Sequence, residues 1–474
     1  MAGKPLPLGS YQLAAPAAGC RRVVNAYVQQ AAPEQPRGDP AVLIRAPGIA
    51  SFAETDEPEV RGFGMLGGFV YAVAGQVVYR IDPDGSETAM TGDLITGNGP
   101  VRVTANATRL VVMPGNGDGF ECDGATVEQI LDADFTTSGG GADGVYLDGF
   151  IAARRPGTRS FINSGVENLT FNGLDIASAN GTPGNIVGLI VNNRELVIAK
   201  EFSTELWYNA ANLTGSPFSR SPDGFKELGC AASRSLCAHD NSPLMLANDK
   251  TFRRLQGVWQ RISQYGIESI VEAMTTRSDC LALPYSQLGH LFVAFTFPFH
   301  GRTLVVDLST GEWHERESMA ANGASYGSWR VQAIIDAYGK TLVGDRVSGK
   351  IGYLDANTYE EWDDPQVMSW TYSPVYAAGL RASHRRIELG FTGGQGTATG
   401  QGVDPKLTLF VSDDGGNTFR ARSTKELGRM GEYQTVLAWD NLGESKNRVY
   451  RAQMSDPVRM FTLDTQLEVE GARP

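Results

Sequence analysis

The sequence predicts an all-β protein built around a β-propeller, and three observations support this fold class. Hairpin-like segments recur at a nearly constant spacing, glycine is abundant with 56 residues, and helix-forming patterns are almost absent. Periods of roughly 40 to 50 residues, each with strands and a tight turn, are typical of propeller blades. Abundant glycine suits many tight turns rather than long helices.

The repeat consists of seven hairpin-like segments, which begin at positions 69, 109, 147, 193, 241, 289 and 338. The shortest interval is 38 residues, between positions 109 and 147, and the longest is 49 residues, between positions 289 and 338. In the first segment, apolar and β-branched residues flank a turn at Ala74-Gly75. Residues 43–365 are therefore expected to form four-stranded blades, with each hairpin supplying the two middle strands. Seven blades are favoured, and six blades with one aberrant unit is the alternative.

The segments on either side of the repeat differ from it in composition. Residues 1–42 are rich in Ala, Pro and Gln without a sustained period, which predicts an irregular N-terminal arm. Residues 366–474 contain strand-like stretches such as His384–Phe391 and a glycine-rich loop at 393–402. About four or five short strands in such a span predict a separate β-sandwich-like domain. The one reasonable helix lies at Tyr265–Thr275.

The composition permits a large core and argues against tight binding of nucleic acid. Hydrophobic residues make up 42% of the chain and charged residues 20%, so wholesale disorder is not expected. The formal net charge is −12, whereas a protein that grips nucleic acid through its phosphates needs a basic face. No stretch reaches the roughly 18 apolar residues of a membrane span, so no membrane anchor is predicted.

One short motif near the C-terminus has recognisable turn chemistry. Residues 412–419, SDDGGNTF, fit the Asp-box pattern S-x-D-x-G-x-T-[W/F]. In this pattern, serine and aspartate oxygens hold the turn of a β-hairpin and the aromatic ring folds beneath it. We therefore expect a structural turn made by Ser412, Asp414, Gly416, Thr418 and Phe419.

Asp boxes also occur in sialidases, so a propeller glycoside hydrolase is the enzymatic alternative, and a glycan- or receptor-binding module is a third interpretation. Arg45, in the segment Leu43–Ile49, is similar to the sialidase arginine that would bind a substrate carboxylate. However, the Asp box occurs once, after the propeller, and no acidic pair stands in the context that a glycosidase requires. The five histidines form none of the usual zinc spacings. The sequence therefore predicts no enzyme, no catalytic residue, no cofactor and no metal site.

Several segments, taken in their order along the chain, resemble one family. They are Cys20–Tyr27, Ala46–Ile49, Arg261–Ser263 with Ile267-Glu268, Gly289–Phe292, Thr310–Arg316, Gly344–Arg346, Gly349–Gly352 and Leu427–Val458. In this ordered set, the chain resembles the packaged-DNA stabilisation protein of short-tailed phages, a tail hub or nozzle component. The resemblance spans nearly the whole chain, and the order of the pieces carries it.

The resemblance implies a structural protein of the virion with no catalytic residues. In that family the subunit is similar to a propeller platform that forms a sixfold ring below the portal and its adaptor. The ring helps to retain packaged DNA and builds part of the ejection channel. The implied partners are further copies in a hexamer, the portal-adaptor protein, and the tail needle or tail fibre and spike proteins. Genomic DNA would pass without tight binding, in a phage tail assembled in the host cytoplasm.

The sequence also suggests where neighbouring subunits would meet. Chain termini usually become ordered only when something ties them down. The N-terminal arm or the run Leu427–Val458 is therefore expected to lie against a neighbouring subunit or the adaptor ring. The candidate assembly residues are Asn25, Tyr27, Glu432, Tyr433, Trp439 and Arg448.

Overall fold

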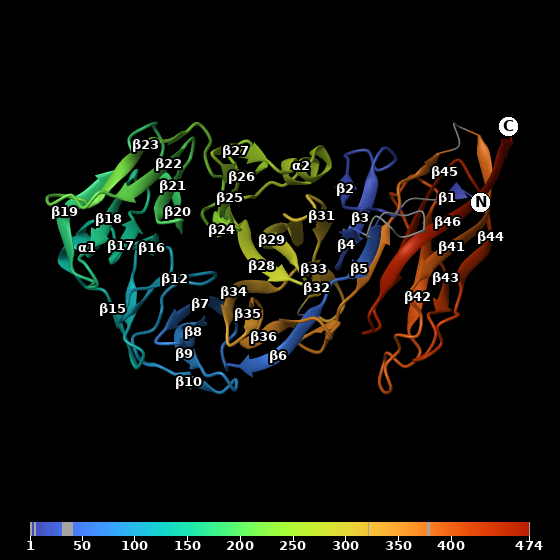
Figure 1. The fold of residues 1–474 in the computed structure, drawn as a ribbon, viewed down its shortest axis with the longest axis horizontal. Helices are drawn as coiled ribbons and strands as arrows, with labels where there is room; N and C mark the ends of the chain where they lie inside the picture. The colour runs from blue at the N-terminus through green and yellow to red at the C-terminus, as the bar shows by residue number, and fades with distance from the viewer. Residues whose placement is uncertain (1, 4–5, 31–40, 321, 377–379, 474) are drawn as a thin grey trace.

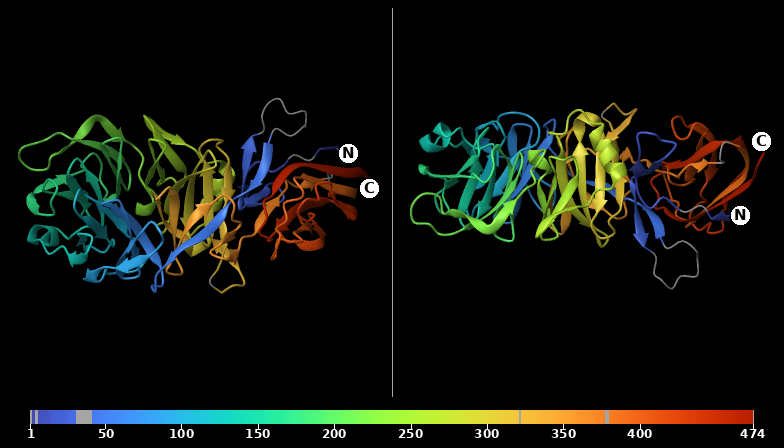
Figure 2. Two further views of the ribbon diagram at one scale, coloured as in Figure 1. Left: turned by 60° about the horizontal axis from the view of Figure 1, so that its bottom comes forward. Right: turned by 90° about the horizontal axis from the view of Figure 1, so that it is seen from above.

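Strands dominate the computed structural model, which describes residues 2–3, 6–30, 41–320, 322–376 and 380–473. Seven small sheets stand around a common axis, and a second β-rich unit lies beside this ring (Figure 1). Seen from the side, the ring and the second unit form one elongated body (Figure 2). The predicted all-β class and the predicted propeller are confirmed.

The propeller has seven blades, and in six of them the four strands follow one another along the chain. Blade 1 comprises β7 (Val60–Leu66), β8 (Phe69–Ala74), β9 (Val77–Ile81) and β10 (Glu87–Ala89). Blade 2 comprises β12 (Arg102–Ala105), β13 (Leu110–Met113), β14 (Phe120–Cys122) and β15 (Thr126–Gln129), with β11 (Thr91–Gly92) at its edge. Blade 3 comprises β16 (Asp143–Leu147), β17 (Phe150–Arg154), β18 (Ser160–Ser164) and β19 (Phe171–Ser178).

The remaining blades repeat this order. Blade 4 comprises β20 (Ile186–Asn192), β21 (Glu195–Lys200), β22 (Thr204–Asn209) and β23 (Phe218–Lys226). Blade 5 comprises β24 (Cys237–His239), β25 (Ser242–Leu246), β26 (Phe252–Gln256) and β27 (Val258–Arg261). Blade 6 comprises β28 (Leu281–Gln287), β29 (His290–Phe297), β30 (Arg302–Asp307) and β31 (Trp313–Glu315). Blade 7 comprises β34 (Val331–Ala337), β35 (Lys340–Asp345), β36 (Lys350–Asp355) and β6 (Gly48–Glu54).

The predicted hairpins supply the middle strands of the blades, from β8–β9 in blade 1 to β35–β36 in blade 7. In six blades, the turn after the innermost strand has two residues with positive φ. These turns are Gly67-Gly68, Asp148-Gly149, Asn193-Arg194, Asp240-Asn241, Leu288-Gly289 and Tyr338-Gly339. Two-residue turns of this kind match the twist of the strands that they join. Local turn chemistry therefore sets the period that is visible in the sequence.

The ring is closed by a strand from the N-terminal part of the chain. The innermost strand of blade 7, β34, contacts the innermost strand of blade 1, β7, which completes the circle. The outermost strand of blade 7 is β6, which pairs antiparallel with β36. Propeller closure therefore joins segments that lie far apart in the sequence.

The second unit is a sandwich of two sheets. One sheet has the order β4-β5-β46-β41-β44, with β1 (Ala2–Gly3) beside β46, and the other contains β3-β39-β45-β42-β43. The strands are β3 (Cys20–Val24), β4 (Ala26–Gln30), β5 (Ala41–Arg45), β39 (Met368–Thr371), β41 (Arg381–Phe391), β42 (Lys406–Ser412), β43 (Arg420–Glu426), β44 (Leu437–Ser445), β45 (Asn447–Met454) and β46 (Phe461–Arg473). The second sheet continues into blade 6, because β3 also pairs with β31. Short strands β2 (Tyr11–Gln12) and β40 (Val375–Tyr376) pair with β3 and β45.

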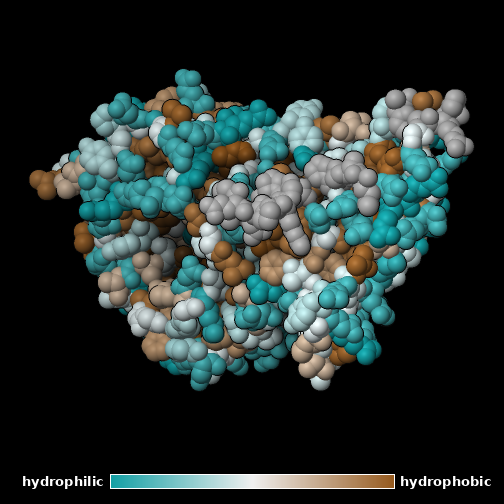
Figure 3. All heavy atoms as spheres, turned by 45° about the vertical axis from the view of Figure 1, so that its right-hand side comes forward, coloured by the Kyte–Doolittle hydropathy of each residue, from teal (hydrophilic) through white to brown (hydrophobic). Residues whose placement is uncertain are grey.

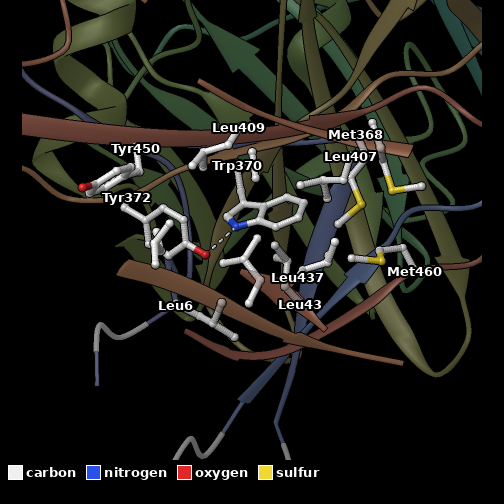
Figure 4. Close-up of a cluster of buried hydrophobic side chains, with 14 of the residues drawn as sticks. Leu6, Leu43, Met368, Trp370, Tyr372, Leu407, Leu409, Leu437, Tyr450 and Met460 are labelled. Carbon is white, nitrogen blue, oxygen red and sulfur yellow. Dashed lines mark hydrogen bonds between the residues drawn. The ribbon is translucent and has the colours of Figure 1, made fainter. Parts of the chain in front are cut away.

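A hydrophobic core fills the space between the two sheets (Figure 4). Leu6 and Leu43 from the N-terminal part pack in the same cluster as Leu409 and Leu437. At its centre, the Trp370 indole nitrogen donates a hydrogen bond of 2.9 Å to the Tyr372 hydroxyl. Both ends of the chain therefore contribute to one core.

The expectation of an irregular N-terminal arm is wrong for residues 20–30, which form β3 and β4. β3 pairs with β39, and β4 pairs with β5, which in turn pairs with β46. Because β39 and β46 lie at the far end of the chain, no local period in the sequence reveals these strands. Residues 31–40 of the predicted arm lie outside the described residues. We propose that β3, β4 and β5 belong to the sandwich, so that the propeller begins after Arg45 and ends near residue 365.

The remaining elements are short. The helix α2 (Tyr265–Glu272) confirms the predicted helix, whereas α1 (Ala133–Thr137) was not predicted because five residues show no helical period. The other short elements are η1 (Ser233–Ser235), η2 (Pro298–His300), β32 (Glu317–Met319), β33 (Tyr326–Ser328), β37 (Glu360–Glu361) and β38 (Asp364–Pro365).

Closure of the ring can be tested at Gly48, the first residue of β6. A Cβ atom at this position would lie 2.0 Å from the Glu360 carbonyl oxygen. Gly48→Ala is therefore expected to destabilise the protein by about 1–3 kcal/mol, as overpacking does, in denaturant unfolding. The control is Gly327→Ala, where a Cβ would meet nothing within 4 Å, and its effect should stay within about 0.5 kcal/mol. Equal stability of the two variants would contradict the role of β6.

Candidate functional site

The Asp-box residues form a turn between β42 and β43 whose hydrogen bonds are internal. The Asp414 carboxylate accepts hydrogen bonds from the Ser412 hydroxyl at 2.6 Å, the Asn417 amide at 2.9 Å and the Thr418 hydroxyl at 2.6 Å. The Gly416 amide donates to the Ser412 hydroxyl at 2.9 Å. Hydrogen bonds from Ser412 and then Thr418 hold the pKa of Asp414 well below its usual range. The carboxylate is fully engaged in holding the turn.

The Asp-box turn lies against the N-terminal segment. A Cβ atom at Gly415 would come within 2.8 Å of Ala17, and one at Gly416 within 3.1 Å of Cys20. The Phe419 ring lies 4.4 Å from the Arg451 guanidinium, in a cation–π contact. The turn thus lies against β3 and the segment before it, within the sandwich. These contacts suit the structural role that the sequence predicts for the turn.

Four of the six predicted assembly residues are buried inside the chain. The exposed fractions are 0% for Asn25, 3% for Tyr27, 2% for Trp439 and 1% for Arg448. The prediction that these residues face a neighbouring subunit is therefore wrong. These four residues contact distant segments of their own chain and not a neighbouring subunit.

Each of the four buried residues has an internal role. The Asn25 side chain donates to the carbonyl oxygens of Glu317 and Val367 at 2.8 Å each. The Tyr27 ring lies 4.9 Å from the His290 ring. The Trp439 indole donates to the Ser423 carbonyl at 3.3 Å, and Arg448 pairs with Asp413 at 2.6 Å.

The other two assembly candidates are exposed, in the loop between β43 and β44. Tyr433 is 72% exposed, and Met430 and Val436 in the same loop are each 60% exposed. Glu432 is also exposed. The loop lies beside the glycine-rich loop, because a Cβ at Gly394 would come within 2.6 Å of the Tyr433 ring. The face of the molecule in Figure 3 shows hydrophilic side chains with hydrophobic ones scattered among them.

A network of charges around the buried Glu315 carboxylate joins the propeller to the sandwich. The Arg22 guanidinium on β3 contacts the Glu315 carboxylate on β31 at 2.8 Å and also pairs with Glu317. Arg302 on β30 binds the same Glu315 carboxylate at 3.0 Å. Burial alone would raise the pKa of Glu315, but the charges of Arg22 and Arg302 lower it below its usual value. We call this set of residues, together with Asn25, the junction.

The sialidase-like arginine also belongs to the boundary between the two units. Arg45 is 1% exposed and donates to the backbone carbonyls of Asp456, Val458 at 3.0 Å, Tyr359 at 3.2 Å and Gln366 at 2.6 Å. Burial lowers its pKa to about 10. Its donors are used by the protein itself, so the substrate-binding role that a sialidase would require has no support here.

Sequence reasoning did not single out Arg22, Glu315 or Arg316 as site residues. All three lie in segments that carried the family resemblance, Cys20–Tyr27 and Thr310–Arg316. The two segments meet each other through the Arg22–Glu315 pair. Both also contact a third segment of the resemblance, Ala46–Ile49, because the Asn25 carbonyl accepts from the Ala46 amide and Arg316 donates to the Pro47 carbonyl at 3.0 Å. The sequence shows these segments separately, and only the structure shows that they meet at the junction.

A narrow cavity of about 400 Å³ runs along the propeller axis. Its walls come from the innermost strands of the blades, and Arg61, Arg102 and Arg234 lie among the lining residues. Within the described ranges, no three His, Cys, Asp or Glu side chains are grouped so as to hold a metal ion. Among those same residues, no helix has the length and apolarity to cross a membrane.

The Asp-box turn can be tested by replacing its carboxylate. Asp414→Ala is expected to lower the thermal unfolding midpoint and to speed proteolysis near Ala17–Cys20, because four donors of the turn lose their acceptor. The control is Asp223→Ala, which removes an exposed carboxylate from β23. A midpoint and a cleavage rate equal to those of the control would contradict the structural role of Asp414.

Comparison with solved structures finds other proteins with a distant likeness. The computationally designed Ika8 protein is 13% identical, covers 64% of this chain and 99% of its own, and gives a TM-score of 0.35. YCF48, solved with a D1 peptide, is 11% identical over 64% of this chain and 95% of its own, with a TM-score of 0.39. PorZ of the Porphyromonas gingivalis type-IX secretion system is 10% identical over 71% of this chain and 44% of its own, with a TM-score of 0.37. Likenesses this distant carry no argument about function, and no curated protein matches the chain.

A protein-family model, in contrast, covers most of the chain. The model described as "Bacteriophage P22 Gp10, beta-propeller" matches residues 26–359. The matched span begins with β4 and includes β5, β6 and all seven blades. This is a family of phage structural proteins of the tail and not a family of enzymes. The chain therefore belongs to the P22 Gp10 family of phage DNA-stabilisation proteins, as its ordered sequence segments had implied.

Proposed function

We propose that the chain is a subunit of a ring in the phage tail, placed below the portal and its adaptor. In this position the ring retains packaged DNA and forms part of the ejection channel. The proposed partners are further copies of the chain, in a hexamer, the portal-adaptor protein, and the tail needle or tail fibre and spike proteins. Membership of the family of DNA-stabilisation tail proteins supports this placement.

The observation that carries the proposal is the narrowness of the propeller axis. The cavity on this axis has a volume of about 400 Å³ and is lined by side chains of the innermost strands. Duplex DNA, whose major groove alone is about 12 Å wide, needs far more room than this, so we infer that a duplex does not thread a single propeller. DNA that passes this protein must therefore run along an outer surface, and a ring of subunits supplies a path lined by such surfaces.

The distribution of charge suits a surface that DNA passes without sticking. Among the described residues, the fully buried charges cancel, with six basic and six acidic side chains. The basic ones are Arg45, Arg61, Lys200, Arg316, Arg330 and Arg448, and the acidic ones are Asp143, Glu205, Asp307, Glu315, Asp345 and Glu361. The net charge of −12 therefore resides on less buried positions. A negatively charged exterior repels phosphates over a Debye length of about 8 Å at physiological salt.

The loop between β43 and β44 is the proposed contact to a neighbouring subunit or to the adaptor. Tyr433 is exposed in this loop near Met430 and Val436, and the loop packs against the glycine-rich loop of the same sheet edge. Tyrosine is enriched at the energetic centres of protein interfaces. Heterologous contacts of this kind close into rings when the rotation between neighbours permits it.

The charge argument predicts weak binding of duplex DNA. The isolated protein should bind a 30-base-pair duplex no more tightly than the roughly 10⁻⁶ M of weak non-specific complexes, in fluorescence anisotropy at physiological salt. A variant with exposed acidic residues reversed, Glu444→Lys with Glu470→Lys, should bind more tightly with a steeper salt dependence. A nanomolar, salt-dependent Kd for the unaltered protein would rule out a non-adhesive path.

The assembly proposal predicts a specific loss on substitution of Tyr433. Tyr433→Ser should leave the fold intact, because the side chain is 72% exposed, but should reduce incorporation into tails about tenfold or more, as loss of an interface anchor does. The measurement is occupancy of the ring in electron micrographs of phage heads supplied with purified protein. Tyr265→Ser is the matched control, since Tyr265 on α2 is 66% exposed on the propeller. Full incorporation of Tyr433→Ser would show that this loop is not the contact.

A further inference from the structure

Arginines gather at one end of the propeller axis. Arg61 is the second residue of β7, Arg102 is the first residue of β12, and Arg234 lies in η1 just before β24. Because every blade repeats the same order of strands, the innermost strands begin at the same face of the ring. All three arginines line the axial cavity of about 400 Å³. We call this end of the cavity the arginine mouth.

Few carboxylates lie near the arginine mouth to balance its charge. Asp143, which is 0% exposed at the start of β16, pairs with Arg102 at 2.9 Å. Its second oxygen accepts from the Ser233 hydroxyl at 3.3 Å. Glu59 lies 4.0 Å from Arg61 and also accepts from the Gln332 amide at 3.2 Å. Three guanidinium groups therefore line the cavity against these two carboxylates, and Arg154 on β17, outside the lining, adds a further positive charge close to Asp143 and Arg234. The mouth thus carries excess positive charge.

The four arginines differ in how completely the protein uses their donors. Arg61 donates to the carbonyls of Gly99 at 2.7 Å, Gly75 at 2.8 Å and Thr96 at 3.1 Å, so its role is structural. Arg234 donates to the Pro100 carbonyl at 3.2 Å through one Nη atom. Over the part of the chain that the structure describes, Arg102 Nη2 and Arg154 Nε are buried without a hydrogen-bond partner. Buried charged donors of this kind usually have an acceptor.

The electrostatic surroundings also favour an anion. Burial, and then the charge of Arg102, lower the pKa of Arg234 to about 10. Burial likewise lowers the pKa of Arg154. A bound anion would offset both penalties, because its negative charge stabilises the nearby guanidinium groups. It would also supply an acceptor for Nη2 of Arg102, which lines the cavity.

We propose that the arginine mouth binds a small tetrahedral oxyanion of the phosphate class. The planar fork of arginine matches the oxygens of such an anion, and the cavity has room for the ion with several waters. Arg102 begins the innermost strand of blade 2 and Arg234 lies just before blade 5, so one anion held by both would tie together blades that are not neighbours. The site lies on the axis of each propeller, apart from the proposed path of the DNA.

Binding of inorganic phosphate to the full-length protein tests the proposal directly. Isothermal titration with sodium phosphate, against sodium chloride of equal ionic strength, should give a saturable heat with one site per chain. Arg234→Gln should weaken phosphate binding about tenfold or more, because it removes a charge-assisted donor. Arg234→Lys should recover part of the affinity. Arg194→Gln, which removes an exposed arginine from a blade 4 turn, should bind like the unaltered protein.

Two further measurements keep the result interpretable. Thermal unfolding without phosphate establishes that Arg234→Gln is folded, and phosphate should raise the midpoint of the unaltered protein more than that of the variant. Competition by a 5′-phosphorylated oligonucleotide distinguishes the source, since displacement of phosphate indicates that a strand end reaches the site and no displacement indicates the free ion. Absence of saturable phosphate binding, or equal affinity in Arg234→Gln and Arg194→Gln, would overturn the proposal.

Discussion

The architecture depends on the return of the N-terminal segment across the whole molecule. Strand β6 completes blade 7, and the strands before it, β3 to β5, complete the sandwich. Between β3 and β4, Asn25 adopts a positive φ of 50°, and its carbonyl oxygen accepts a hydrogen bond from the Ala46 amide. Neither the propeller nor the sandwich is complete until both ends of the chain meet. The two units therefore form one cooperative body rather than two domains joined by a free linker.

The junction fixes how the two units are oriented more than it adds stability. In the Arg22–Glu315 pair the carboxylate is buried and the guanidinium is partly exposed, and burial of the carboxylate costs part of the Coulombic gain. The pair does, however, penalise any arrangement that separates the partners, since a lone buried charge is costly. A protein that must hold its shape against packaged DNA benefits from such a geometric constraint. This gives a physical reason why the segments that carry the family resemblance converge on the junction.

The parts of the fold that could be predicted are those encoded locally. The middle strands of each blade are joined by turns such as Asn193-Arg194, so periodicity reveals them. Strands β3 and β43 could not be found in this way. β3 pairs with β39 far along the chain, and every residue of β43 is exposed, so no alternation of apolar side chains marks it. A sequence does not distinguish an interface within a chain from one between chains, so it points to Trp439 and Arg448 as assembly residues although both are buried within the chain.

The distribution of charge between the interior and the exterior suits a protein along which DNA passes without tight binding. Its buried charges are engaged in internal contacts, such as Arg45 with backbone carbonyls and Arg316 with Glu361. Arg61, Arg102 and Arg234 lie on the propeller axis, in the wall of a cavity of about 400 Å³. The exterior keeps the negative balance. In the proposed arrangement these arginines stabilise the ring of blades at a distance from the DNA, and the outer surface along which the DNA would pass carries the negative balance.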